Sequence, residues 1–249
     1  MNNGADRMPT ILEVKDLRKE YPGVKAVDGI SFLVKQGTCF GLLGPNGAGK
    51  TTTFHIITGM ISPDKGTVRM GERDLTKLAM YRRARLGVGY LAQEPSVFRK
   101  LSVEQNLMAI LEMMPLRKAD RKIRMEELLM EFSIAHLAKQ RADTLSGGER
   151  RRLEIARSLV TRPKFILLDE PFAGIDPIAV IDIQEIVKDL KERGIGVLIT
   201  DHNVHETLSI TDRAYLLYDG QILKSGTSEE LVSDEMVRKL YLGRNFELR

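Results

Sequence analysis

Short, nearly unbroken apolar runs alternate with longer amphipathic segments along this chain. The runs CFGLL (39–43), FILLDEP (165–171) and GVLITDH (196–202) contain few polar positions, and such runs are typical of parallel strands that are covered on both faces. The amphipathic segment 177–193 lies between the last two runs, so it predicts a strand–helix–strand unit. The pattern therefore predicts an α/β fold built on a parallel sheet.

The first predicted strands of the chain show a mixed pattern. ILEVKDL, SFLVKQ and TCFGLL are separated by turn signals at Pro22–Gly23 and Gly37, and the first two mix apolar with polar residues, which predicts a half-exposed antiparallel edge. GVGYLAQ (87–93) predicts a further strand. Asp219–Gly220 stands between two apolar stretches, so it predicts a hairpin.

Helical periodicity dominates the middle of the chain, from about Pro95 to Lys139. Four apolar residues there recur at i, i+3, i+4 and i+7 and should share one helix face: Met125, Leu128, Leu129 and Phe132. We expect a single domain over residues 10–249. Its core with an antiparallel β subdomain should span residues 10–94 and 160–249, and a helical subdomain should span residues 95–159.

Composition narrows the class of protein without selecting a function. The 249 residues, 43% hydrophobic and 29% charged, suit one globular unit. No apolar run approaches the roughly 18 residues of a membrane span, and MNNGADRMPT lacks the apolar core of a signal peptide, so we expect a cytosolic protein. The single cysteine, Cys39, lies in an apolar run and is expected to be a core residue.

The net charge of +4 is compatible with a polyanionic partner, yet 34 acidic residues are interspersed with the basic ones. The clusters RKADRKIR (117–124) and ERRR (149–152) have no interleaved aromatic residues for base stacking. We therefore expect solvated helix faces at both clusters and no nucleic-acid partner.

The most informative segment is GPNGAGKTT, which follows the apolar run 39–43 and precedes the predicted helix TTTFHIIT. It contains G-x-x-x-x-G-K-[ST], in which glycines let backbone N–H groups wrap nucleotide phosphates. Lys50 adds a positive charge, Thr51 offers a hydroxyl to Mg²⁺, and Thr52 can reach a further phosphate. The expected nucleotide-binding residues are Gly44, Pro45, Asn46, Gly47, Ala48, Gly49, Lys50, Thr51 and Thr52.

Two carboxylates end the stretch FILLDE (165–170). Asp169 is placed to hold Mg²⁺ through water, and Glu170 is placed to orient an attacking water. Because paired carboxylates at the end of a buried strand repel each other without a cation, a purely structural role is the weaker interpretation.

LSGGE (145–149) has a local explanation, since Ser146 and Glu149 fit a capping box at the start of a helix. Together with the glycine-rich loop before it and LLDE after it, however, it makes nearly the whole chain resemble the ATP-binding-cassette (ABC) ATPases. This resemblance implies an α/β P-loop NTPase core of the RecA-like type, with an antiparallel β subdomain and an α-helical subdomain. It also implies ATP hydrolysis with Mg²⁺.

The resemblance also assigns roles to residues outside the loop. Ser146, Gly147 and Gly148 would complete the ATP site of a second copy, which implies a homodimer. Gln93 would contact Mg²⁺ and His202 the γ-phosphate, so both would join Glu170 as catalytic residues. The implied metal-binding residues are Thr51, Gln93 and Asp169.

Two further ATP contacts follow from the same resemblance. Tyr21 matches the aromatic residue that stacks on adenine, although a surface tyrosine beside Pro22–Gly23 is the alternative. Asp176 matches the acid of the D-loop. The chain departs from the frequent family pattern at Ala173 and Asn203, which leaves the finer contacts of those positions open.

A lone cassette without long insertions or zinc-binding cysteines resembles a transporter subunit. Within the family, residues 93–111 and the stretches LLDEPFAGIDPIAVIDIQEIVKDL, ITDHNVHETL and YLGRNFEL are most similar to the ATPases of lipopolysaccharide export systems. The ATPases of branched-chain amino-acid importers are the alternative, and a regulatory cassette that only binds nucleotide is a second one. A cassette of that second kind usually lacks the equivalent of Glu170 or His202.

The resemblance further implies permease partners in the inner membrane and a peripheral position on its cytoplasmic face. The region around Phe98 and Arg99 would form the groove for a short cytosolic helix of the permease, although Phe98 is equally compatible with a core position.

Overall fold

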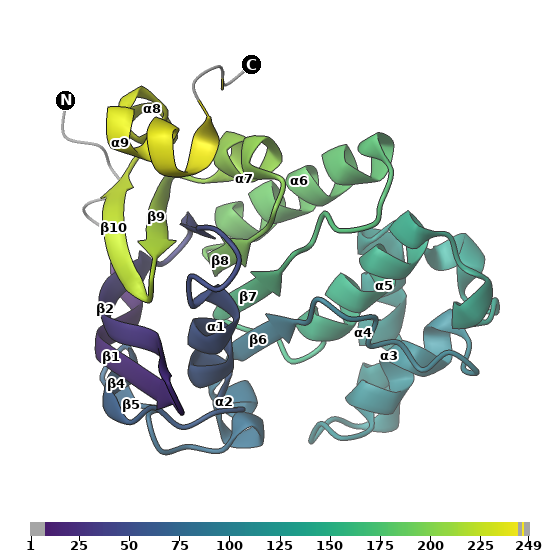
Figure 1. Cartoon of the computed structure of the whole chain (residues 1–249). Coiled ribbons are helices and arrows are strands. Elements are labelled where there is room, and N and C mark those ends of the chain that lie inside the picture. The colour runs from purple at the N-terminus through teal and green to yellow at the C-terminus, as the bar shows by residue number, and fades with distance from the viewer. Residues whose placement is uncertain (1–7, 244–245, 247–249) are drawn as a thin grey trace.

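The computed structural model describes residues 8–243 and 246, and its centre is a six-stranded sheet in the order β10-β9-β3-β8-β7-β6 (Figure 1). Strands β6 to β9 and β3 run parallel, and β10 pairs antiparallel with β9 at the edge. The strands span Cys39–Leu43 (β3), Val88–Leu91 (β6), Phe165–Asp169 (β7), Gly196–Thr200 (β8), Arg213–Tyr218 (β9) and Gln221–Gly226 (β10).

The apolar runs are continuous because their side chains enter two different cores. In β7, Ile166 and Leu168 pack into a cluster with residues of α4, α5 and α6, whereas Phe165 and Leu167 pack into a second cluster with residues of α1. Every residue of β3, β7 and β8 is buried, as predicted for a sheet covered on both faces.

A second, antiparallel sheet in the order β2-β1-β4-β5 lies beside helix α1 (Figure 1). Its strands are Thr10–Tyr21 (β1), Val24–Lys35 (β2), Lys65–Met70 (β4) and Arg73–Asp74 (β5). Leu12, Val14 and Leu17 of β1 join the core that also contains Phe54 and Ile57 of α1. This sheet therefore covers the helix that follows the glycine-rich loop.

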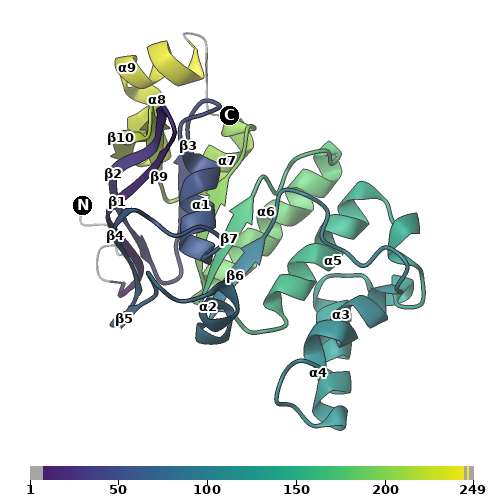
Figure 2. The ribbon, with the colours of Figure 1, turned by 60° about the horizontal axis from the view of Figure 1, so that its bottom comes forward.

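Helices α3, α4 and α5 form a group on the opposite side of the central sheet from the antiparallel strands (Figure 2). The four residues predicted to share one helix face, Met125 to Phe132, are all buried there. The helices are Lys50–Thr58 (α1), Met80–Leu86 (α2), Val103–Leu111 (α3), Lys118–Glu131 (α4), Gly147–Leu159 (α5), Pro177–Glu192 (α6), Val204–Ile210 (α7), Ser228–Ser233 (α8) and Glu235–Val237 (α9), with further helical turns of 3₁₀ or π type at Ala135–Leu137, Ala142–Thr144 and Arg238–Leu242.

The predicted hairpin is confirmed, since Asp219 and Gly220 both adopt positive φ angles, 46° and 75°, between β9 and β10. Cys39 is fully buried, as expected. The predicted strand 87–93 was too long, because β6 ends at Leu91 and leaves Gln93 in the following loop.

The expected division at residues 10–94, 95–159 and 160–249 stays a prediction, and its last residues, 244–245 and 247–249, lie outside the described part. So do residues 1–7, on which most of the signal-peptide argument rests, and part of the stretch YLGRNFEL. Within the described residues, no helix combines the length and the apolar character needed to span a bilayer.

Candidate nucleotide site

The glycine-rich loop connects the end of β3 to the start of α1, as predicted. Two of its glycines are required by close backbone packing. A Cβ atom on Gly49 would lie 2.3 Å from the carbonyl oxygen of Ala26, and one on Gly44 would lie 2.3 Å from that of Leu217. Gly49 also has a φ of 100°, in the left-handed region. The loop therefore packs against β2 and β9. This packing fixes the conformation of a loop that its glycine content alone would leave flexible.

Lys50 is buried at the first position of α1, and its ammonium group reaches back across the loop. Its Nζ atom donates to the carbonyl oxygens of Gly44 at 2.6 Å and Pro45 at 3.0 Å. Burial lowers the pKa of Lys50, and the nearby carboxylates of Glu170 and Asp169 act in the opposite direction. The lysine is therefore preorganised inside the loop, beside both acids.

Asp169 ends β7 and is only 2% exposed. One carboxylate oxygen, Oδ2, accepts a hydrogen bond from the Tyr90 hydroxyl at 3.2 Å, while Oδ1 is buried and has no partner among the described residues. Burial raises the pKa of this carboxyl, and the charge of Glu170 adds to the effect. A buried carboxylate oxygen without a donor is what a divalent cation such as Mg²⁺ would satisfy, directly or through water.

Glu170 follows with a positive φ of 47°. Both of its carboxylate oxygens are held: Gln93 Nε2 donates to Oε2 at 2.8 Å, and His202 Nε2 lies 2.8 Å from Oε1. Because β6, β7 and β8 are neighbouring parallel strands, the loops after their carboxyl ends meet at one edge of the sheet. The structure thus brings the three predicted catalytic residues together, next to Lys50 and Asp169.

The expectation of a solvated face at residues 149–152 was wrong for Arg151, which is 5% exposed. Its guanidinium group donates to the carbonyl oxygens of Asp169 (3.1 Å), Glu170 (2.9 Å) and Pro171 (3.2 Å), and so supports the loop that carries Glu170. The signal was present in the sequence, since Arg151 falls at i+3 from Gly148 and i−4 from Ile155, on the buried face of α5.

Asp201 is a second residue that the sequence reasoning missed. It is buried, and burial raises its pKa. Its two carboxylate oxygens accept from the backbone N–H groups of Phe172 and Asn203, each at 2.9 Å. Asp201 therefore ties the loop after Glu170 to the loop that carries His202.

The predicted capping box at the start of α5 is confirmed. The Ser146 hydroxyl accepts from the Glu149 N–H at 3.3 Å, and Glu149 accepts from the Ser146 N–H at 2.8 Å, which lowers the pKa of Glu149. A Cβ atom on Gly148 would lie 2.8 Å from that of Ala179 on α6. In Figures 1 and 2, α5 and α1 lie apart with β6 and β7 between them, so one chain does not unite Ser146, Gly147 and Gly148 with its own glycine-rich loop.

The two remaining predicted contacts have local roles in the free chain. Asp176 caps α6 through 3.0 Å hydrogen bonds from the N–H groups of Ile178 and Ala179. Tyr21, at the end of β1, has an exposed ring, and the Lys19 ammonium lies 5.6 Å from its centroid. An exposed ring at a strand end has a face available for stacking.

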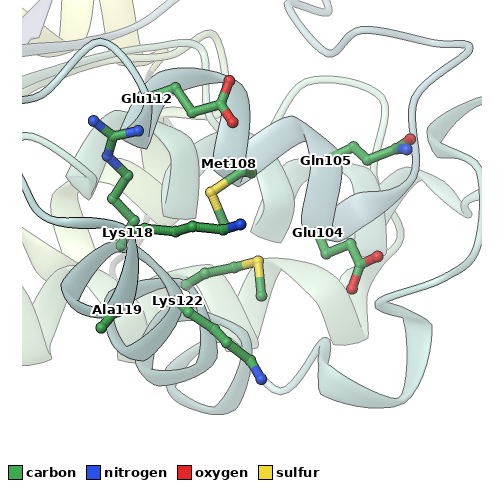
Figure 3. Close-up of a pocket in the computed structure, with 9 residues that line it drawn as sticks. Glu104, Gln105, Met108, Glu112, Lys118, Ala119 and Lys122 are labelled. Atoms are coloured by element: carbon green, nitrogen blue, oxygen red, sulfur yellow. The ribbon is translucent and has the colours of Figure 1, made fainter.

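A separate hollow of about 760 Å³ lies between α3 and α4. Figure 3 shows Glu104, Gln105, Met108 and Glu112 on one wall and Lys118, Ala119 and Lys122 on the other. Its lining includes no residue of the nucleotide motifs, so it is distinct from the site described above.

The loop after β3, its buried lysine and the acidic end of β7 place the protein in the P-loop class. The profile of the ABC transporter family matches residues 27–173, more than half of the chain, and the chain belongs to this family. The expected ABC ATPase and its fold are thereby confirmed.

Relatives and solved structures agree with this assignment. The chain is 53% identical over 241 residues to the lipopolysaccharide export system ATP-binding protein LptB of Acidithiobacillus ferridurans, covering 97% of this chain and 100% of the relative. It is 51% identical over 238 residues to the LptB protein of Escherichia coli K12, covering 95% and 99%. Among solved structures, an ATP-binding cassette of an ABC transporter in its ADP conformation superposes with a TM-score of 0.85 at 31% identity, covering 95% and 100%.

Proposed function

We propose that this chain is the ATP-hydrolysing subunit of a lipopolysaccharide exporter. The observation that best supports ATP hydrolysis is the position of Glu170. Its carboxylate contacts Gln93 and His202, beside Lys50 and Asp169. In this proposal Glu170 orients a water molecule and accepts its proton as the water oxygen attacks the γ-phosphorus of ATP. The bond to the β–γ bridging oxygen breaks, and ADP and phosphate leave.

The phosphates of the substrate ATP are proposed to lie in the loop 44–52. Backbone N–H groups and the N-terminus of α1 face them there, and the Lys50 ammonium exchanges its carbonyl partners for phosphate oxygens. Thr51, Gln93 and Asp169 would hold Mg²⁺, which supplies positive charge to the phosphate oxygens. His202 would stabilise the charge that develops on the γ-phosphate.

Two copies are proposed to form a homodimer around two ATP molecules. Ser146 caps a 13-residue helix that begins with Gly147 and Gly148, and the N-terminus of this helix suits the γ-phosphate held by the other copy. Tyr21 would stack on adenine and Asp176 would lie at the subunit junction. Closure of the dimer around ATP and its reopening after hydrolysis would move the permease.

The assignment to lipopolysaccharide export is supported by relatives of that name, which share half of their residues with this chain over nearly its full length. These relatives favour export over the branched-chain amino-acid importer. We further propose that the chain sits on the cytoplasmic face of the inner membrane by binding permease subunits. Phe98 is 46% exposed, which supports docking of a permease helix at the surface formed by Phe98 and Arg99.

A pull-down tests this assignment. The tagged chain is isolated from detergent-solubilised native membranes, and the proteins retained with it are identified by mass spectrometry. Permeases that carry periplasmic domains and co-purify with lipopolysaccharide support the proposal, whereas permeases with amino-acid-binding partners would replace it by import. We expect Phe98→Ala to lower permease recovery at least about tenfold, as loss of a docking hot spot does. Tyr81→Ala, which removes another exposed aromatic side chain, should leave recovery unchanged.

A further inference from the structure

A buried ion pair on α5, between Glu154 and Arg151, binds both the loop that bears Phe98 and the loop that bears Glu170. Glu154 is 4% exposed, and its Oε2 accepts from Arg151 Nη1 at 3.0 Å. Arg151 in turn binds the carbonyl oxygens of Asp169 and Glu170, and it also binds that of Ala92 at 3.1 Å. Arg151 thus joins the segments after β6 and β7.

The other carboxylate oxygen of Glu154 binds the segment that bears Phe98. Its Oε1 accepts from the Ser96 N–H at 2.8 Å. The Ser96 carbonyl accepts from Arg157, also on α5, and the Arg157 guanidinium carbon lies 4.7 Å from the centroid of the Phe98 ring. A continuous set of contacts therefore runs from an exposed aromatic side chain to the backbone of the catalytic carboxylate.

Asn106 makes the Phe98 end of this set rigid. It is fully buried, its Oδ1 accepts from the Phe98 N–H at 2.8 Å, and its Nδ2 donates to the Phe98 carbonyl oxygen at 3.1 Å. This two-way bond anchors Phe98 to α3. A displacement of Phe98 would therefore move the whole segment 92–98 and not the Phe98 side chain alone.

From this geometry we infer that Glu154 is a positioning residue that couples the permease-docking surface at Phe98 to the catalytic Glu170. The inference rests on the proposed function for the identity of what docks and of what is hydrolysed. Glu154 contacts both of these regions. One of its carboxylate oxygens binds the segment that bears Phe98, and the other binds the arginine that supports Glu170.

Glu154→Gln is the decisive variant. Glutamine has nearly the same volume, but it offers a single acceptor oxygen, and its NH₂ group must face either the Ser96 N–H or the Arg151 guanidinium, both of which are donors. Because the amide can interchange between these two orientations and carries no charge in either, both connections are weakened while the packing is kept. The matched control is Asp182→Asn, which breaks the ion pair of Arg152, on α5, with α6 and touches neither loop.

The first readout is amide hydrogen exchange on the isolated chain, which requires no activity. We expect Glu154→Gln to speed exchange in both segments 92–98 and 169–172 at least about tenfold, and Asp182→Asn to leave both unchanged. Faster exchange in one segment only, or in neither, would overturn the inference whether or not the chain hydrolyses ATP. A general loss of protection throughout the chain would likewise overturn it, because Glu154 would then serve the fold as a whole.

The second readout is steady-state ATPase activity of the permease complex. We expect Glu154→Gln to lower kcat about tenfold, a typical effect of losing one charge-assisted hydrogen bond, with KM for ATP changed less than about twofold. Phe98→Ala in that background should cause no further loss in complexes matched for ATPase content. Additive losses would overturn coupling through Glu154. A wild-type complex without ATPase activity would instead refute the proposed function, and the exchange result would still decide the inference.

Discussion

Asp169 shows the conflict between stability and function at the scale of a single residue. It is buried with one oxygen accepting from Tyr90 and the other without a donor, beside the second carboxylate, Glu170. Burial raises its pKa above the usual 3.8, so the folded chain binds this proton more tightly than the unfolded chain does. The stability that protonation contributes is present at low pH and is lost as pH rises through the raised pKa.

Asp169→Asn should therefore stabilise the nucleotide-free protein at pH 7, because it removes an ionised group that burial penalises. We expect scanning calorimetry to show a higher Tm, by about 2–4 °C for each kcal/mol, and MgATP should protect the variant less than it protects the wild type. Asp74→Asn is a control of opposite sign, since hydrogen bonds from Thr76 lower the pKa of Asp74. A Tm for Asp169→Asn at or below the wild-type value would contradict this account of the site.

The positions of residues that belong to a local sequence motif could be predicted from the sequence. Lys50 lies six residues from the carbonyl group it binds at Gly44, and the loop pattern places both. The partners of Arg151 could not be predicted in this way, because Ala92 and Glu170 lie 59 and 19 residues away and are contacted through backbone oxygens, which any residue type carries. Helical periodicity indicates that Arg151 is buried, but it does not indicate what the arginine binds.

At the scale of elements, the sequence predicts which segments are strands better than it predicts where they end or which are neighbours. β6 ends two residues before Gln93, and β8 ends two residues before His202, so both of these candidate catalytic side chains lie in loops. Their meeting at Glu170 depends on the order β8-β7-β6. Strand order follows from how helices pack on both faces of the sheet, and no periodicity records it.

At the scale of elements, two helix caps allow the structural role of Ser146 to be separated from its proposed role in ATP hydrolysis. Helices α5 and α8 begin with equivalent capping boxes, Ser146 with Glu149 and Thr227 with Glu230. Ser146→Ala and Thr227→Ala should each lower the free energy of unfolding by about 1 kcal/mol, measured in urea. Only Ser146→Ala should also lower the ATPase rate, because only that hydroxyl is proposed to face a phosphate. Equal ATPase rates for the two variants would reduce Ser146 to a helix cap.

At the scale of the whole molecule, α5 lies apart from α1 (Figures 1 and 2), so in the proposed homodimer each chain would contribute two half-sites. The glycine-rich loop, Asp169 and Glu170 would form one half, and Ser146 with its two glycines would form the other. Two chains arranged head to tail would complete two sites at once, and each nucleotide would then bridge the subunits. ATP would therefore act as part of the interface, and its hydrolysis would weaken that interface.

Glu170→Gln should trap the closed pair. The amide keeps the shape of the side chain but cannot accept a proton from water, so hydrolysis should slow by about 10²- to 10⁴-fold while binding persists. Light scattering after size-exclusion chromatography with MgATP should then show a species of twice the 28.0 kDa chain mass, which EDTA dissociates. Glu192→Gln, at the far end of α6, should behave as the wild type. If Glu170→Gln binds ATP and still elutes only as a monomer, the two half-sites do not meet around nucleotide and the homodimer is wrong.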